Sequence, residues 1–254
     1  MILACRPIAS GRAEGEVLVL NDDFSFLGGV DTSTGDLRVG TGGNLSGRIF
    51  AFRRGKGSTV GSYTIFDLKS KGIAPAGLIN GTAETIVTTG AVISDIPLVD
   101  GMDVSVLRDG DRAVIDGDEG TIELTDLVLK EVVTGIVKRG EDILLMRRSD
   151  KEFHFPRMWG GASGRIEEGE DPQEAACREL LEETSMTSTP VNIGEPFLVR
   201  GDDIIWRVHP VLFEGSAEPV LNWEHCEYRW VSPAEARGME TVPRLDEVLS
   251  RLGL

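Results

Sequence analysis

Cysteine is scarce in this chain, and its scarcity limits the sites that the chain can build alone. The 254 residues include three cysteines, Cys5, Cys177 and Cys226. Cysteines that are odd in number and far apart form neither a disulfide framework nor the ligand spacing of a zinc or iron–sulfur site. We therefore interpret all three as isolated, buried thiols.

Long apolar runs are also missing. No segment reaches the ~18 consecutive apolar residues that a membrane-spanning helix needs, because charged residues interrupt the longest runs. Residues 1–7 lack the basic and apolar regions of a signal peptide. We expect a soluble, cytoplasmic protein that makes no contact with a membrane.

Basic residues are outnumbered. The chain has 26 lysines and arginines against 42 aspartates and glutamates, which gives a net charge of -16. A negative surface repels nucleic acid, so binding to DNA or RNA is disfavoured. An acidic enzyme that acts on small phosphorylated substrates therefore needs a metal ion or a local cluster of cations to offset the repulsion.

The apolar content and the length favour two domains, and the pattern of elements makes the first mostly β and the second α/β or α+β. Apolar residues make up 41% of the chain, which supports real cores and excludes a disordered protein. A length of 254 residues suits two domains of about 100–150 residues each. Most of the 31 glycines fall in the first half, whereas strands and helices alternate in the second. We place the domains at 1–125 and 129–254.

Alternating apolar residues and turn signals predict the elements of each half. In the first, mostly β half we expect strands at 15–20, 47–52, 85–88, 91–94, 112–116 and 121–124 and a helix at 62–71, the last two strands forming a hairpin. In the second half we expect strands at 131–137, 142–146, 196–200, 204–214 and 228–231, with helices at 172–184 and 243–252.

The helix at 172–184 carries three carboxylates on one face. At 100° per residue, Glu179, Glu182 and Glu183 fall within ~100° of arc, and Arg178 reaches Glu182 at i,i+4. The opposite face is expected to pack on a sheet and carries Cys177, Leu180, Leu181 and Thr184. Such carboxylates repel one another unless a hard divalent cation such as Mg²⁺ binds among them. The alternative is a solvated acidic surface.

The spacing of these residues resembles the Nudix hydrolase signature, G-x5-E-x7-R-E-U-x-E-E-x-G-U, in which U is aliphatic. The matching positions are Gly164, Glu170, Arg178, Glu179, Leu180, Glu182, Glu183 and Met186. Ser185 replaces the last glycine, so we expect modest strain or altered geometry at the end of the helix. The resemblance covers residues 129–254 and favours the metal site over the solvated surface.

The Nudix resemblance implies an α/β/α sandwich that uses Mg²⁺ or Mn²⁺ to hydrolyse a nucleoside diphosphate linked to another group, or a similar diphosphate. Glu179, Glu182 and Glu183 would hold the metal, and Glu182 is the candidate catalytic residue. One of these three, or Glu224 or Glu227, would activate water.

Further residues of this half are candidates for binding the substrate. Arg147, Arg148 and Arg157 are candidate phosphate ligands, although each is an ordinary surface arginine in the alternative interpretation. His154, Phe155 and Trp159 are candidates to line the substrate pocket. In the alternative interpretation, they are aromatic residues of the core.

A glycine-rich loop in the first half gathers cations around a hydroxyl group. Arg53, Arg54 and Lys56 precede Ser58, and the spacing is that of neither a Walker A loop nor a dinucleotide fingerprint. A flexible basic turn is the alternative. In so acidic a chain, these cations are a candidate oxyanion site that stabilises a serine alkoxide.

The whole first half resembles the swivelling domain of aconitase X, a family that includes the small subunit of archaeal phosphomevalonate dehydratase. The matching stretches are residues 6–16, 24–31, 55–63 and 74–77, and the match covers about residues 2–125. It implies a β/β/α swivelling fold. The serine of the family's G-[RK]-G-S loop is a base, and it falls on Ser58.

That resemblance also implies a partner and a reaction. The chain would form a heterodimer with an aconitase-like large subunit that carries an iron–sulfur cluster. Together they would dehydrate (R)-5-phosphomevalonate to trans-anhydromevalonate 5-phosphate in isoprenoid biosynthesis, with Arg53, Arg54 and Lys56 binding substrate. We predict a fusion of both activities. The alternatives are a Nudix domain that senses a diphosphate, or a first domain that is only a scaffold.

Overall fold

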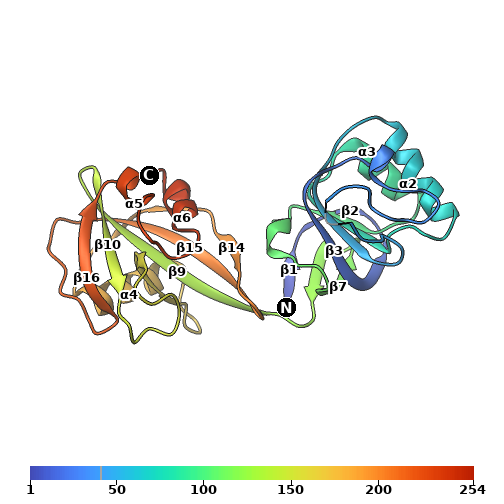
Figure 1. The fold of residues 1–254 in the computed structure, drawn as a ribbon. Helices are drawn as coiled ribbons and strands as arrows, with labels where there is room; N and C mark the ends of the chain where they lie inside the picture. The colour runs from blue at the N-terminus through green and yellow to red at the C-terminus, as the bar shows by residue number, and fades with distance from the viewer. Residues whose placement is uncertain (41) are drawn as a thin grey trace. The chain divides into compact units, whose positions relative to one another are not determined.

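The computed structural model describes residues 1–40 and 42–254 and divides the chain into two units, Met1–Val128 and Leu129–Leu254. Each unit has a mixed sheet and its own helices (Figure 1). The predicted two-domain α/β class is therefore confirmed. Among the described residues, no helix is long and apolar enough to cross a membrane.

The described strands of the first unit form one eight-stranded sheet in the order β1-β8-β7-β3-β4-β5-β6-β2. Strands β3 to β6 are parallel, and the remaining pairs are antiparallel. The strand bounds are β1 Ile2–Ala4, β2 Arg6–Ala9, β3 Arg12–Phe24, β4 Ile49–Gly55, β5 Gly77–Thr82, β6 Leu98–Asp100, β7 Arg112–Asp116 and β8 Thr121–Leu124. The predicted hairpin is the β7–β8 pair.

Long strand β3 bends this sheet into two layers. Its first residues pair with β7 and its later residues pair with β4. The β7 layer lies on the parallel strands, because a Cβ added at Gly77 of β5 would come within 2.9 Å of Ile115 Cδ1. Helices α2 (Val60–Ser70) and α3 (Thr85–Ile93) pack side by side (Figure 1) and share a core with β4 and the turn α1 (Phe26–Gly29). The result is a β/β/α arrangement.

The strands predicted at 85–88 and 91–94 are wrong, because helix α3 occupies this segment. The carboxylate of Glu84 caps the helix by accepting from the N–H groups of Ile86 and Val87 at 2.8 and 2.9 Å. Gly90 then lets α3 approach α2, since a Cβ there would lie 2.4 Å from Ile65 Cδ1. Capping and packing outweigh the strand preference of the β-branched residues.

The described strands of the second unit form another sheet, with a central order β11-β10-β9-β15-β13. Strands β12, β14 and β16 pair with β9, β15 and β10, respectively. The strand bounds are β9 Val128–Arg139, β10 Asp142–Arg148, β11 Trp159–Gly160, β12 Ala162–Arg165, β13 Pro190–Ile193, β14 Phe197–Arg200, β15 Ile204–Glu214 and β16 His225–Val231. The helix bounds are α4 Pro172–Thr184, α5 Pro233–Ala236 and α6 Leu245–Leu252.

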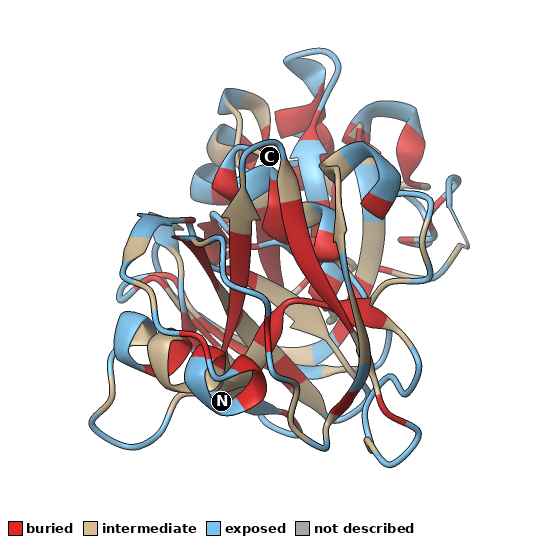
Figure 2. Cartoon of the chain, turned by 90° about the vertical axis from the view of Figure 1, so that its left-hand side faces the viewer, coloured by how far each residue is buried: buried red, intermediate tan, exposed pale blue. Residues whose placement is uncertain are grey.

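Alternate residues of β10 serve two cores, one on each face of this sheet. Leu144 packs in the core that contains Leu180 of α4, whereas Leu145 packs in the core that contains Leu249 of α6. Buried residues accordingly follow the strands and the inner sides of the helices (Figure 2). The unit is an α/β/α sandwich.

The buried-thiol interpretation holds only in part. Cys5 and Cys177 are half-buried, and Cys226 is exposed. Burial raises the pKa of the Cys5 thiol to about 11. Cys226 is the extra residue of β16 where the pairing with β10 shifts between Arg147 and Arg148, and the neighbouring His225 is buried instead.

Candidate functional site

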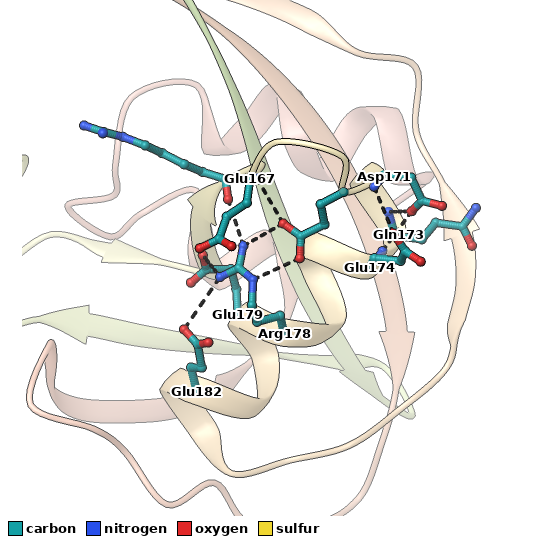
Figure 3. Close-up of polar contacts among 9 residues, drawn as sticks. Glu167, Asp171, Gln173, Glu174, Arg178, Glu179 and Glu182 are labelled. Carbon is teal, nitrogen blue, oxygen red and sulfur yellow. Dashed lines mark hydrogen bonds and ion pairs between the residues drawn. The ribbon is translucent and has the colours of Figure 1, made fainter.

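Helix α4 begins where the sequence predicts. The side chain of Asp171 accepts from the N–H groups of Gln173 and Glu174 at 2.8 and 2.9 Å, and Glu174 accepts from Asp171 N–H at 3.1 Å. Figure 3 shows this capping box beside the first turn of the helix. Pro172 occupies the first helical position. The cap fixes where the carboxylates of the following turns lie.

Arg178 is the cation around which the carboxylates of Glu170, Glu179 and Glu182 gather (Figure 3). Its Nε and Nη2 donate to the two oxygens of Glu170 at 2.9 Å each, and its Nη1 donates to Glu179 Oε1 at 2.6 Å. The predicted contact with Glu182 is a longer ion pair of 3.6 Å. These hydrogen bonds lower the pKa of Glu170 and hold Glu179 in place.

The signature glycine Gly164 makes room for Glu179. Gly164 lies in β12, and a Cβ added there would come within 1.8 Å of Glu179 Oε1. The strand therefore approaches the carboxylate more closely than any side chain allows. Ser185 closes the same helix with φ +55°, the left-handed conformation that glycine usually occupies. The helix end therefore keeps the geometry of a glycine, and the substitution shows itself as strain at Ser185 and not as an altered turn.

Glu183 lies on the buried side of α4, which corrects the predicted assignment of faces. The buried residues follow the spacing of Ala176, Leu180, Glu183 and Thr184, whereas Leu181 is 49% exposed. The buried face is centred nearer to Glu183 than to Leu181, because it is set by the contacts of the sheet. Glu179 and Glu182 therefore lie beside the buried face of α4, whereas the prediction places all three carboxylates on the opposite side of the helix.

The Glu183 carboxylate is only partly compensated. Its Oε1 accepts from Ser163 N–H at 3.2 Å, and its Oε2 has no partner among the described residues. Burial raises the pKa of Glu183 well above its ordinary value, and the neighbouring Glu179 and Glu224 raise it further. Burial also raises the pKa of both Glu179 and Glu224. The carboxylates are thus close enough to repel one another.

His225 is a member of this region to which the sequence assigns no role. Its side chain is 1% exposed, and its Nδ1 lies 3.7 Å from Glu183 Oε2. Burial lowers the pKa of His225 to about 4. A bulge between Arg147 and Arg148 sets the register that brings His225 here, and no local sequence signal predicts it.

The donor set of this region fits a hard divalent cation. Within the described part of the chain, no three His, Cys, Asp or Glu side chains already stand as a metal-binding group. The carboxylate oxygens of Glu179, Glu182 and Glu183 are nevertheless the ligand type that Mg²⁺ and Mn²⁺ prefer. The unpartnered Glu183 Oε2 is a buried acceptor that a cation would satisfy.

The predicted phosphate ligands bind neighbouring protein groups. Arg148 pairs with Glu152 at 2.5 Å and donates to the His154 carbonyl, with most of its side chain buried. Arg147 donates to the Arg157 carbonyl at 3.0 Å and is half-exposed. These arginines fix the loop between β10 and β11, and Arg147 is the more accessible of the two.

The predicted pocket residues His154, Phe155 and Trp159 do not lie in one environment, and Glu227 binds arginines. Trp159 is buried in the core beside α6, so it follows the core interpretation. The His154 ring contacts Phe153 and Trp206 edge-on, and Phe155 is partly exposed. The Glu227 carboxylate accepts a hydrogen bond from Arg229 Nε, and its Oε2 lies 3.7 Å from Arg147 Nη1.

Ser58 lies at the carboxyl edge of the parallel strands of the first unit, immediately before α2. The loop is anchored where Lys56 N–H donates to the Phe24 carbonyl at 2.8 Å. Gly57 has φ +107°, and a Cβ there would lie 2.7 Å from Ser25 Oγ. Residues 56–59 are all exposed. Glycine thus allows a tight turn that presents the Ser58 hydroxyl to the surface.

The cationic side chains near Ser58 do not all point to the same side of the sheet. Arg53 and Arg54 are consecutive residues of β4, so their side chains leave opposite faces of the sheet. Arg54 lies 3.9 Å from Asp23. The sequence gives no role to Glu84, yet its carboxylate packs against Gly55, where a Cβ would meet Oε1 at 2.3 Å.

Comparison with known proteins assigns each unit to a family. Residues 2–124 match the family model of the aconitase X swivel domain, and residues 129–252 match that of the NUDIX domain. The phosphomevalonate dehydratase small subunit of Thermococcus onnurineus is 50% identical over 133 residues, which cover 50% of this chain and 100% of that protein.

Solved structures resemble the two units separately. The crystal structure of Thermococcus kodakaraensis aconitase X in its holo-form is 50% identical, with a TM-score of 0.47, and the match covers 49% of this chain and 98% of that chain. The MutT protein from Methanosarcina mazei Go1 is 26% identical, with a TM-score of 0.45, and the match covers 52% of this chain and 96% of that one.

Proposed function

This chain belongs to the aconitase X swivel family and carries a Nudix hydrolase domain, and we propose from this that it works as two enzymes in one polypeptide. Residues 1–125 are the small subunit of a phosphomevalonate dehydratase, and residues 129–254 are a metal-dependent hydrolase of diphosphates. The observation that carries the first activity is the 50% identity over the full length of the T. onnurineus small subunit.

In the proposed dehydratase, Ser58 is the base. As the alkoxide, its Oγ takes a proton from the carbon next to the one that bears the leaving hydroxyl group of (R)-5-phosphomevalonate. The electron pair of that C–H bond forms the double bond of trans-anhydromevalonate 5-phosphate, and the hydroxyl group leaves as hydroxide. A proton from solvent completes the water molecule, and the proton on Ser58 returns to solvent, which restores the alkoxide. Lys56, with Arg53 or Arg54, binds the phosphate. An iron–sulfur cluster in the large subunit would supply a Lewis acid for the leaving group.

The exposure of Ser58 supports a requirement for that partner. A serine hydroxyl in bulk water is a poor base, so the loop needs a second surface that excludes water. Val60, Tyr63 and Phe66 follow Ser58 on the outer side of α2, and they are 47%, 69% and 49% exposed. Apolar and aromatic residues at this spacing are typical of the centre of a protein interface. In the proposed complex, the large subunit covers Val60, Tyr63 and Phe66.

Reconstitution tests the dehydratase proposal. The full chain is co-expressed with the iron–sulfur large subunit of its own organism, and dehydration of phosphomevalonate is measured in the purified complex. Ser58→Ala is expected to lower turnover by about 10²–10⁴-fold, as expected for loss of a general base, while the complex still forms. Failure of the two chains to assemble, or full activity of the alanine variant, would contradict the proposal and favour the scaffold alternative.

In the proposed hydrolase, Glu179, Glu182 and Glu183 hold Mg²⁺ or Mn²⁺. The bound ion would offset the charge of the diphosphate and lower the pKa of water. Arg178 fixes Glu179, and Ser163 N–H holds Glu183. Glu182 is 56% exposed, so its carboxylate is the most free to face substrate and water. The carrying observation is the partly compensated carboxylate cluster itself.

A substrate panel tests the hydrolase. The full chain is incubated with Mg²⁺ and with nucleoside diphosphates linked to other groups or isoprenoid diphosphates, and released phosphate or monophosphate is measured. Glu182→Gln is expected to abolish turnover, and Glu168→Gln, an exposed glutamate in the same segment, is the matched control. Unchanged turnover in Glu182→Gln would refute the assignment. Saturable binding without any turnover would favour the sensor alternative.

A further inference from the structure

His225 is a buried imidazole whose hydrogen-bonding groups are unused. Neither Nδ1 nor Nε2 has a hydrogen-bond partner among the described residues, although the side chain is 1% exposed. Leaving buried polar groups unpaired is costly. The nearest acidic oxygen is Glu183 Oε2, at 3.7 Å from Nδ1, and it is unpartnered as well. Two unsatisfied groups of complementary chemistry therefore face each other.

The backbone around His225 keeps the ring at this place. Asn222 N–H donates to the Glu183 carbonyl at 3.1 Å, and Val220 N–H donates to the Thr184 carbonyl at 2.8 Å. Ser149 N–H donates to the Glu224 carbonyl at 2.7 Å, which ties the start of β16 to the end of β10. The segment before β16 is thus attached to the end of α4, and the ring is presented to Glu183.

We infer that His225 is a positioning residue for the metal site, in which its Nδ1–H donates to Glu183 Oε2 while Ser163 N–H donates to Oε1. The inference rests on the proposed function, in which Glu183 binds Mg²⁺ or Mn²⁺. A closer approach of under ~1 Å brings the pair to hydrogen-bond distance. A carboxylate oxygen that accepts one hydrogen bond keeps a second lone pair for a cation. His225 therefore fixes the orientation of the ligand without binding the metal.

Mn²⁺ affinity of the full chain without substrate tests this role. Free Mn²⁺ is measured by electron paramagnetic resonance for wild type, His225→Leu, His225→Asn and His225→Gln. Loss of a group that orients a metal ligand weakens metal binding by about 10–100-fold, and this is expected for His225→Leu. Asparagine places an amide N–H where Nδ1 lies and is expected to bind within about threefold of wild type. Glutamine places its amide at the Nε2 position and is expected to bind as weakly as leucine.

His209→Leu is the matched control. His209 also faces a carboxylate, at 2.7 Å from Glu131 Oε2 in the same unit, but Glu131 is not a proposed metal ligand. Its Mn²⁺ affinity is expected to equal that of wild type. If thermal unfolding shows that His225→Leu does not fold, the comparison of asparagine with glutamine decides.

Three results would overturn the inference. They are unchanged Mn²⁺ affinity in both His225→Leu and His225→Gln, equal weakening by asparagine and glutamine, and a spin-echo modulation from an imidazole nitrogen bonded to Mn²⁺. A wild-type chain that binds no Mn²⁺ would instead refute the proposed hydrolase site, and the inference with it. The two failures are therefore distinguishable.

Discussion

Replacing Gly164 with alanine tests whether the hydrolase depends on a fixed Glu179 carboxylate. A Cβ at this position would come within 1.8 Å of Glu179 Oε1 and 2.0 Å of its Cδ. Gly164 has no positive φ, so the backbone itself accepts alanine. The strain therefore falls on the carboxylate and on the approach of β12 to α4.

The size of the effect follows from the overlap. Ordinary contacts of a Cβ begin at 3.4 Å, so the oxygen or the strand must move by roughly 1.6 Å. A movement of this size breaks the 2.6 Å hydrogen bond from Arg178 to Glu179. Misplacement of a reacting group by ~1 Å costs about 10²-fold in activity. Since Arg178 keeps its two bonds to Glu170, the loss of folding free energy is only about 1–2 kcal/mol.

Two quantities are measured for wild type and Gly164→Ala. The first is kcat/KM on the best substrate of the panel at saturating Mn²⁺, and the second is Tm in the absence of metal. Gly238→Ala is the control, because its Cβ would meet its nearest atom, the Glu235 carbonyl oxygen, at 3.4 Å. We expect Gly164→Ala to lose about 10²-fold in kcat/KM while Tm falls by roughly 5 °C. A folded variant with kcat/KM close to wild type would refute the claim that this glycine positions Glu179.

Three other predictions address the metal, the pH and the partner. Saturation with Mn²⁺ at about 100 times its Kd is expected to stabilise the chain by about 2.7 kcal/mol in calorimetry, and Glu183→Gln is expected to remove this gain. The lowered pKa of His225, about 4, means that the unfolded chain binds a proton first as pH falls. Stability of wild type relative to His225→Asn is therefore expected to fall by up to about 3 kcal/mol between pH 6.5 and 4 in urea titrations, and parallel curves would contradict this. Tyr63→Lys is expected to weaken large-subunit binding at least about tenfold in calorimetric titration, whereas Val92→Lys on α3 leaves it unchanged.

Local signals explain which elements could be predicted from the sequence. The helix expected at 172–184 is α4 itself, because its capping box and proline act within one turn. The sequence of 85–94 predicts strands, because β-branched residues favour them. Its helix depends on the Glu84 cap and on the fit of Gly90 to Ile65, and the second of these comes from a distant part of the chain.

The candidate site shows the same division. Signature spacing predicts Glu179, Glu182 and Glu183 as metal ligands. It does not say that Glu183 is buried, since burial depends on which side of α4 meets the sheet. His225 could not be predicted from periodicity, because the bulge between β10 and β16 sets its register. A sequence pattern can place residues on an element, but only the packing of that element decides which of them lack a partner.

The two proposed sites differ in how they offset the repulsion between an acidic chain and a phosphorylated substrate. Lys56 beside Ser58 is exposed, and Arg53 and Arg54 leave opposite faces of β4. In the proposed dehydratase, a partner surface would therefore complete the phosphate site. In the hydrolase, the internal cation Arg178 is already engaged by Glu170 and Glu179. Arg178 makes no ion pair with Glu183 among the described contacts, and Glu183 Oε2 has no hydrogen-bond partner among the described residues. The demand for a divalent ion therefore arises at Glu183, and substitution of Glu183 is expected to weaken metal binding more than substitution of the exposed Glu182.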